Sequence, residues 1–220
     1  MSKHLRRELD KIKKKMLSLG ALVEERTRMV VQATVGLDAD IAQKIIASDW
    51  EVDEMEVEIE EECLKILALY QPVAVDLRFL IATIKINNDM ERIGDECVNI
   101  AERLTIIAKR PPMQYVFDYS PMSEKVQAML KSSLDALVNL DVDLAFKVIT
   151  MDDEVDDIQT QAYHHIKEAI KQYPDRVGYL VNLLLVSRHL ERIADHSTNI
   201  AEEVVYLIEG EIVRHGNIGV

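Results

Sequence analysis

The stretch Glu91-Arg-Ile-Gly-Asp-Glu-Cys-Val-Asn-Ile-Ala-Glu102 decides the fold, because it recurs one hundred positions later. The second copy is Glu191-Arg-Ile-Ala-Asp-His-Ser-Thr-Asn-Ile-Ala-Glu202, and eight of the twelve positions are identical. The repeat extends upstream at an offset of 103, where Glu51-Val-Asp53 matches Glu154-Val-Asp156. Self-similarity at a fixed period sets the architecture before any local argument does. The sequence therefore predicts two related halves.

Each half carries three segments with the apolar spacing of a helix. We expect helices over about 5–37, 41–70 and 73–108, and again over about 122–140, 142–172 and 175–209. The residue before a proline is pushed away from helical geometry, so Gln71-Pro72 and Tyr173-Pro174 mark breaks, and Gly210 stands where a helix ends.

Helices joined by short turns pack antiparallel, and three of them make the smallest bundle with a closed core. We therefore predict an all-α protein of two tandem, sequence-related three-helix bundles, six helices in all. The expected boundaries are 1–110 for the first bundle, 111–121 for a linker and 122–220 for the second bundle.

The composition narrows the function classes. The chain has 220 residues, 48% of them hydrophobic, and a formal net charge of −13. That charge argues against nucleic-acid binding, which depends on a basic surface. The N-terminal residues lack the apolar core of a signal peptide, and no run approaches the roughly 20 apolar residues of a membrane span. Cys63 and Cys97 fall on apolar helix faces, so we expect reduced thiols in a cytoplasmic protein.

Each half contains two pairs of acidic residues spaced four apart, which makes the members of a pair neighbours on a helix. Like charges at that spacing repel by about 0.2–0.5 kcal/mol per pair, so four pairs at matched positions suggest a role beyond solvation. The helical phase places them away from the apolar face, outward or along a groove between adjacent helices. The candidate metal ligands are Asp49, Asp53, Glu91, Asp95, Asn99, Asp152, Asp156, Glu191, Asp195 and Asn199. The alternative is an ordinary solvated acidic surface.

Carboxylate and amide oxygens suit hard cations such as Mg²⁺, Mn²⁺, Ca²⁺ or iron. Carboxylates that converge from two antiparallel helices could bridge more than one ion, whereas a structural Cys/His zinc site is not supported. We interpret His189 and His196 as structural or surface histidines, with a hydrogen bond from His196 to a ligand as an alternative. The basic residues Lys11 and 13–15 wrap around their helix. They indicate solvated surface, with contact to anionic lipid as the alternative.

Three runs carry a family resemblance: Pro72-Val-Ala-Val-Asp-Leu-Arg78, Asn88-Asp-Met-Glu-Arg-Ile-Gly-Asp95 and Leu190-Glu-Arg-Ile-Ala-Asp-His196. They resemble the PhoU family of phosphate-specific transport accessory proteins, and the resemblance covers essentially the whole chain. It implies two three-helix bundles that carry metal clusters, most readily of iron, with Mn, Mg, Zn or Ca as alternatives. The motif positions fall on Asp49/Asp53, Glu91/Asp95, Asp152/Asp156 and Glu191/Asp195.

The resemblance further implies a regulator of phosphate uptake and phosphate-starvation signalling, not an enzyme. The expected partners are a phosphate ABC transporter ATPase and a sensor histidine kinase, with a homodimer and with membrane contact only through partner proteins. The halves differ where Arg188 replaces Asn88 and His196 replaces Glu96. The two sites are therefore expected to differ in ion number or affinity.

Two other functions remain as alternatives. A carboxylate-bridged di-iron oxidase uses Glu-x-x-His pairs that project into a bundle core, and none of the six histidines has a Glu three residues before it. A metal-free helical scaffold would leave the acidic residues inert. We find no nucleophile–base constellation and no glycine-rich phosphate loop.

Overall fold

The computed structural model describes residues 3–113 and 117–211, and every regular element within these ranges is a helix. The elements are α1 (Lys3–Gly36), α2 (Ala39–Ala47), α3 (Trp50–Tyr70), α4 (Ala74–Ala108), α5 (Ser120–Asn139), α6 (Val142–Gln172), the 3₁₀ turn η1 (Pro174–Arg176) and α7 (Val177–Glu209). The prediction of an all-α protein is confirmed.

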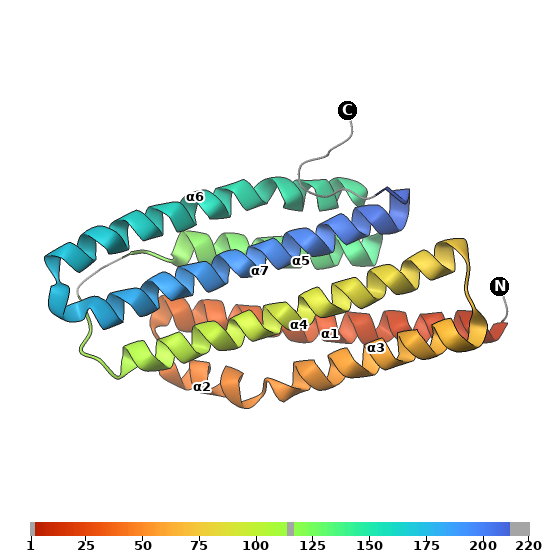
Figure 1. Cartoon of the computed structure of the whole chain (residues 1–220), viewed down its shortest axis with the longest axis horizontal. Helices are drawn as coiled ribbons and strands as arrows, with labels where there is room; N and C mark the ends of the chain where they lie inside the picture. Colours follow the sequence, from red (N-terminus) through yellow and green to blue (C-terminus); the bar gives the residue numbers. More distant parts are fainter. Residues whose placement is uncertain (1–2, 114–116, 212–220) are drawn as a thin grey trace.

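The helices run along the long axis of the molecule (Figure 1). In the first half, α2 and α3 follow one another along one course and pack with α1 and α4. In the second half, α5, α6 and α7 pack together. The two halves meet chiefly through α4 and α7, which lie side by side in the middle of the view. The predicted pair of three-helix bundles is therefore confirmed, and α4 and α7 form the seam between them.

The repeat is visible in local geometry as well as in sequence. Leu37 and Leu140 lie 103 positions apart, and each ends the first helix of its half in the left-handed region, with φ of 49° and 52°. The aspartates that follow them cap the next helix. Asp38 accepts hydrogen bonds from the backbone of Asp40 and Ile41, and Asp141 accepts one from Leu144. Such side-chain caps satisfy backbone N–H groups at helix starts.

The prediction of one continuous helix over about 41–70 was wrong, because the chain breaks at Ser48 and Asp49. Arg26 of α1 is nearly buried and donates to the Ser48 carbonyl at 3.3 Å, an acceptor that an unbroken helix would use itself. Arg26 also pairs with Glu51. At the offset of 103, Met129 and Met151 take the places of Arg26 and Ser48, and α6 runs through unbroken.

Two other boundaries differ from expectation. Ser120 and Pro121, assigned to the linker, lie in the first turn of α5, where proline is tolerated because its missing N–H would have no partner. The last long helix begins at Val177 instead of Asp175, after η1. The predicted stop at Gly210 is confirmed, since its φ of 79° is one that glycine adopts at little cost.

The apolar faces of all the long helices join in one core, and Cys63 and Cys97 lie in it. Burial raises the pKa of each thiol to about 12, so both cysteines stay protonated and unreactive near neutral pH. Within the described ranges, none of the helices combines the length and apolar character needed to cross a bilayer.

Candidate metal-binding site

The first acidic cluster lies where the start of α3 meets the middle of α4. Burial raises the pKa of Asp49, and the charges of Asp53 and Asp95 raise it further. Burial likewise raises the pKa of Glu91, with Asp95 next in weight and Arg92 opposing both. The charges of Asp53 and Asp95 thus act on Asp49 and Glu91 from the neighbouring helix as well as from their own.

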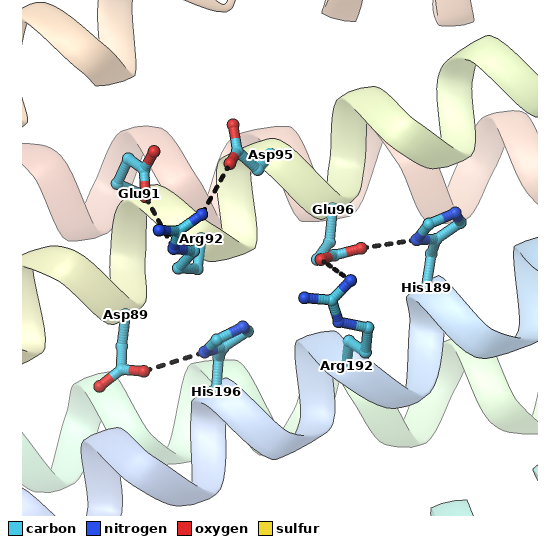
Figure 2. Close-up of polar contacts among 8 residues, drawn as sticks. All are labelled: Asp89, Glu91, Arg92, Asp95, Glu96, His189, Arg192 and His196. Carbon is cyan, nitrogen blue, oxygen red and sulfur yellow. Dashed lines mark hydrogen bonds and ion pairs between the residues drawn. The ribbon is translucent and has the colours of Figure 1, made fainter.

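Arg92 partly compensates this first cluster. Its guanidinium lies 3.6 Å from Glu91 Oε2 and 3.6 Å from Asp95 Oδ2 (Figure 2). For Asp95, burial is again the largest cause of a raised pKa, and Arg92 lowers it. The cluster thus keeps a cation of its own within ion-pair distance.

The second acidic cluster lies between α6 and α7. Burial raises the pKa of Asp152 to about 6, and Asp195 and Asp156 are the next causes. The pKa of Glu191 is raised by burial and by Asp195 and Asp156, while Arg188 opposes the rise. The expectation that Arg188 places a positive charge beside this cluster agrees with that contribution.

None of the eight acids in the two clusters is fully buried, as predicted, but most are half-buried between helices instead of lying on an open face. Two oxygens, Glu91 Oε2 and Asp152 Oδ1, are buried without a hydrogen-bond partner. A buried carboxylate oxygen without a donor is costly. A cation would compensate each of these oxygens.

The donor set therefore suits a hard cation, but the side chains do not already form a cage. Among residues 3–113 and 117–211, no three His, Cys, Asp or Glu side chains are arranged so that they could hold a metal ion. Exposed members such as Asp53 and Asp156 have room to change rotamer. Ion binding would draw carboxylates together that otherwise repel one another.

The two asparagines of the predicted ligand set lie toward the seam. Asn199 Nδ2 donates to Asp89 Oδ1 at 3.1 Å. Asn99 is close enough to Glu96 for a hydrogen bond that helps to lower the pKa of that carboxyl. Both amides thus interact with carboxylates, Asp89 and Glu96, that are not among the predicted metal ligands.

The seam itself holds a polar network that the sequence analysis did not identify. His196 Nδ1 of α7 lies 2.9 Å from Asp89 Oδ1 of α4, and His189 Nδ1 lies 2.6 Å from Glu96 Oε2 (Figure 2). Arg192 adds an ion pair to Glu96 at 2.9 Å. Burial raises the pKa of Glu96, but His189 and Arg192 outweigh it, so the pKa is lowered and the carboxylate stays charged.

These two histidine–carboxylate contacts are equivalent under the repeat. Asp89 corresponds to His189 and Glu96 to His196 at the offset of 100, so exchanging the halves turns one contact into the other. The interpretation of both histidines as structural is supported by their partners. An alignment of the halves contained the signal, because Asp89 and Glu96 of α4 correspond to His189 and His196 of α7.

Comparison with known proteins identifies the same two halves. The family model of the PhoU domain matches the chain twice, over residues 16–104 and 119–204. The chain belongs to the PhoU family. A PhoU homolog of Aquifex aeolicus is 38% identical over 96% of both chains. One of Pseudomonas aeruginosa is 36% identical over 98% of this chain and 89% of its own. Both relatives are described as phosphate-specific transport system accessory proteins.

Solved PhoU structures share the architecture. The crystal structure of PhoU from Pseudomonas aeruginosa matches with a TM-score of 0.90 at 34% identity, over 94% of this chain and 99% of that one. The phosphate transport system regulatory protein PhoU from Streptococcus pneumoniae matches with a TM-score of 0.84 at 29% identity, over 96% and 100%. This PhoU chain thus spans the length of its relatives and keeps their fold.

Proposed function

We propose that this protein regulates phosphate uptake and phosphate-starvation signalling as a cytoplasmic adaptor. The observation that carries the proposal is the double PhoU-domain match, together with full-length relatives that are accessory proteins of phosphate transport. The expected partners are the ATPase of a phosphate ABC transporter and a sensor histidine kinase. The protein would act by docking and not by chemistry.

We further propose that the two acidic clusters bind metal ions, most readily iron. Glu91 and Asp152 support this. Glu91 Oε2 is buried and has Arg92 Nε only at 3.6 Å, beyond hydrogen-bond distance, and Asp152 Oδ1 is buried without a hydrogen-bond partner among the described residues. Asp49 and Asp95 would complete the first site, and Glu191 and Asp195 of α7 the second. A bound cation supplies positive charge there. The surface that a partner meets would then depend on occupancy, since the same residues repel one another without it.

The adaptor role is tested by pull-down of the transporter ATPase and of the sensor kinase from detergent-solubilised membranes. The full chain should capture at least one of them, and a chelator should weaken that capture. If neither partner is captured with or without metal, the adaptor role is wrong.

The metal's part is tested separately with Glu91→Gln, Asp95→Asn, Glu191→Gln and Asp195→Asn combined, which keeps side-chain shape and removes charge. The matched control replaces four exposed acids that form no ion pair in the described chain, namely Glu61→Gln, Glu124→Gln, Asp143→Asn and Asp175→Asn. Elemental analysis should find metal in the wild type and control but not in the cluster variant. Equal metal content in all three would contradict the assignment of these residues.

No observation favours the oxidase alternative. The eight carboxylates lie on half-buried or exposed helix faces, whereas such an oxidase needs its ligands inside the bundle. The metal-free scaffold alternative is separated from our proposal by the same elemental analysis.

A further inference from the structure

Positive charge is concentrated at one end of an otherwise acidic molecule. Residues 1–15 carry seven Lys or Arg and two Asp or Glu, a net charge of +5, so the remaining chain carries −18. Along the described part of this segment, helix α1 presents Lys3, Arg6, Arg7, Lys11 and Lys14 on one side, in a shallow hollow that also contains Asp10. Because the chain as a whole is acidic, its overall composition does not account for this compact basic surface.

Most of these basic side chains are available to an external anion. Lys3, Arg6, Arg7 and Lys14 are exposed, and among the described residues none has a carboxylate within ion-pair distance. Lys11 is exposed but pairs with Glu8 at 2.8 Å. We call Lys3, Arg6, Arg7 and Lys14 the basic stripe.

An exposed apolar surface lies at the same end of the molecule. The turn between α3 and α4 sits beside the start of α1 (Figure 1). On this turn Leu69, Val73 and Val75 are 67%, 75% and 64% exposed, and Leu77 is also exposed. We call these four residues the apolar tip. These four branched side chains are not among the residues of the hydrophobic core.

The helices that carry the basic stripe and the apolar tip contact each other next to these surfaces. Lys13 of α1 lies over the ring of Phe79 in the second turn of α4, 5.4 Å from its centroid. Lys13, Val75 and Phe79 also line one groove of about 570 Å³. The first turns of α1 and α4 therefore form one continuous surface with a charged part and an apolar part.

We infer that this end of the molecule, the basic stripe together with the apolar tip, binds the surface of an anionic lipid bilayer directly. Lipid phosphates would pair with the stripe, and the tip would enter the headgroup region. Peripheral membrane binding requires two contributions. Exposed apolar side chains insert into the headgroup region, and basic residues are attracted to anionic lipid. This inference replaces the expectation that the protein contacts membrane only through partner proteins, and it develops the alternative of contact with anionic lipid.

The surface is independent of the acidic clusters. From Val75 to Asp95 the α4 helix advances about 30 Å, at roughly 1.5 Å per residue. Lipid binding at the end of the bundle would thus leave both clusters and the seam exposed to solvent and to protein partners.

Flotation of the full chain with lipid vesicles tests the inference, using the purified protein and no transporter. Vesicles of phosphatidylcholine with about one third phosphatidylglycerol should carry the protein, and vesicles of phosphatidylcholine alone should not. Binding should fall as salt rises from about 50 to 500 mM, because the charges lie at the surface.

The basic-stripe variant is Lys3→Glu, Arg6→Glu, Arg7→Glu and Lys14→Glu combined. Its matched control reverses four exposed lysines that form no ion pair in the described chain, Lys44, Lys109, Lys131 and Lys147. At about 1 kcal/mol per basic residue, the stripe variant should bind at least about 30-fold more weakly, and the control should bind within about threefold of wild type. A second variant, Val73→Ser with Val75→Ser, should weaken binding several-fold without changing its salt dependence.

Two results would overturn the inference. One is a wild-type protein that does not float with anionic vesicles. If the stripe variant then loses capture of a membrane protein, the basic stripe would bind protein and not lipid. The other is an equal loss in the stripe variant and its control, which would indicate overall charge alone. Circular dichroism of each variant confirms that the comparison is made between folded chains.

Discussion

The two acidic clusters have matching residues but different compensation. In the first, Arg92 lies within 3.6 Å of Glu91 and of Asp95. In the second, the equivalent Arg192 lies 2.9 Å from Glu96 of the other half. Arg92 thus forms ion pairs within its own cluster, whereas Arg192 forms one with the seam, although its charge still opposes the rise in the pKa of Asp195.

The clusters also differ at the equivalent residues Asp49 and Asp152. The pKa of Asp152 rises to about 6 because of burial and because Asp195 and Asp156 stand beside it, while the rise at the equivalent Asp49 is smaller. Duplicated motifs therefore do not guarantee duplicated electrostatics. Burial and the neighbouring carboxylates are the largest causes at both positions, and only Asp49 has an opposing arginine among its causes, Arg26 of α1.

The largest expected effect on stability comes from breaking the contact that holds Arg192 at the seam. Glu96→Gln removes the charge of a carboxylate that is 3% exposed and has two basic partners. It should lower the free energy of unfolding by about 2 kcal/mol. This is less than for a fully buried ion pair, because Arg192 is half exposed and solvent screens its charge. Denaturant melts should show a smaller loss for Asp89→Asn, which has one histidine partner. Equal losses would mean that Arg192 adds nothing.

The next largest effect is a difference in cation affinity between the two clusters. Asp152→Asn with Asp195→Asn should cost more affinity for Mn²⁺ or Fe²⁺ than the equivalent pair Asp49→Asn with Asp95→Asn, by about tenfold or roughly 1.4 kcal/mol. Titration calorimetry of metal-stripped protein measures the difference. If the first pair instead cost more affinity, the positive charge of Arg188 would be what weakens cation binding at the second cluster.

The raised pKa of Asp152 predicts a pH dependence for the protein in chelator. A carboxyl whose pKa is higher when folded binds its proton more tightly in the folded state, so stability is lost as pH rises through about 6. Asp152→Asn removes that loss and should stabilise the protein at pH 7 by about 1 kcal/mol, with no gain at pH 4.

Thermal melts at the two pH values measure this, with Asp49→Asn as the matched control. The control should gain less, and added metal should reverse the sign for Asp152→Asn. A gain that persists at pH 4 would point to a cause other than charge.

The smallest effect concerns the packing behind the clusters. Gly94 stands where the second half has Ala194, and a Cβ there would lie 3.1 Å from Val52 Cγ1. Gly94→Ala should therefore change stability by less than about 0.5 kcal/mol, because crowding offsets the better helix propensity of alanine. In a Val52→Ala background the same change should become stabilising by about 0.5–1 kcal/mol. Urea melts of the four proteins complete the cycle.

The fold was largely predictable, because the repeat and the apolar spacing act over short distances along the chain. The break at Ser48 was not, since it depends on Arg26, which lies 22 residues earlier and reaches it only after α1 has packed. Local pattern placed Asp38 and Asp141 before the second helix of each half, and the structure shows both as caps.

For the site, spacing alone predicted which acids share a helix face, and the structure places those of neighbouring helices together. What spacing could not supply is the partner of each arginine. Arg92 and Arg192 occupy equivalent positions, and only the packing of α4 against α7 directs them differently. The roles of Asp89 and Glu96 were missed for the same reason, because their partners lie about a hundred residues away.

The exchange of acid for base across the seam has a consequence for how the chain could have arisen and how it can be taken apart. If two copies of the first half met through α4, Asp89 would face Glu96 of the other copy, and the carboxylates would repel each other. Two copies of the second half would oppose histidine to histidine. Only unlike halves are compatible, so a chain cut in the connecting segment should reassemble as a mixed pair and never as two identical ones.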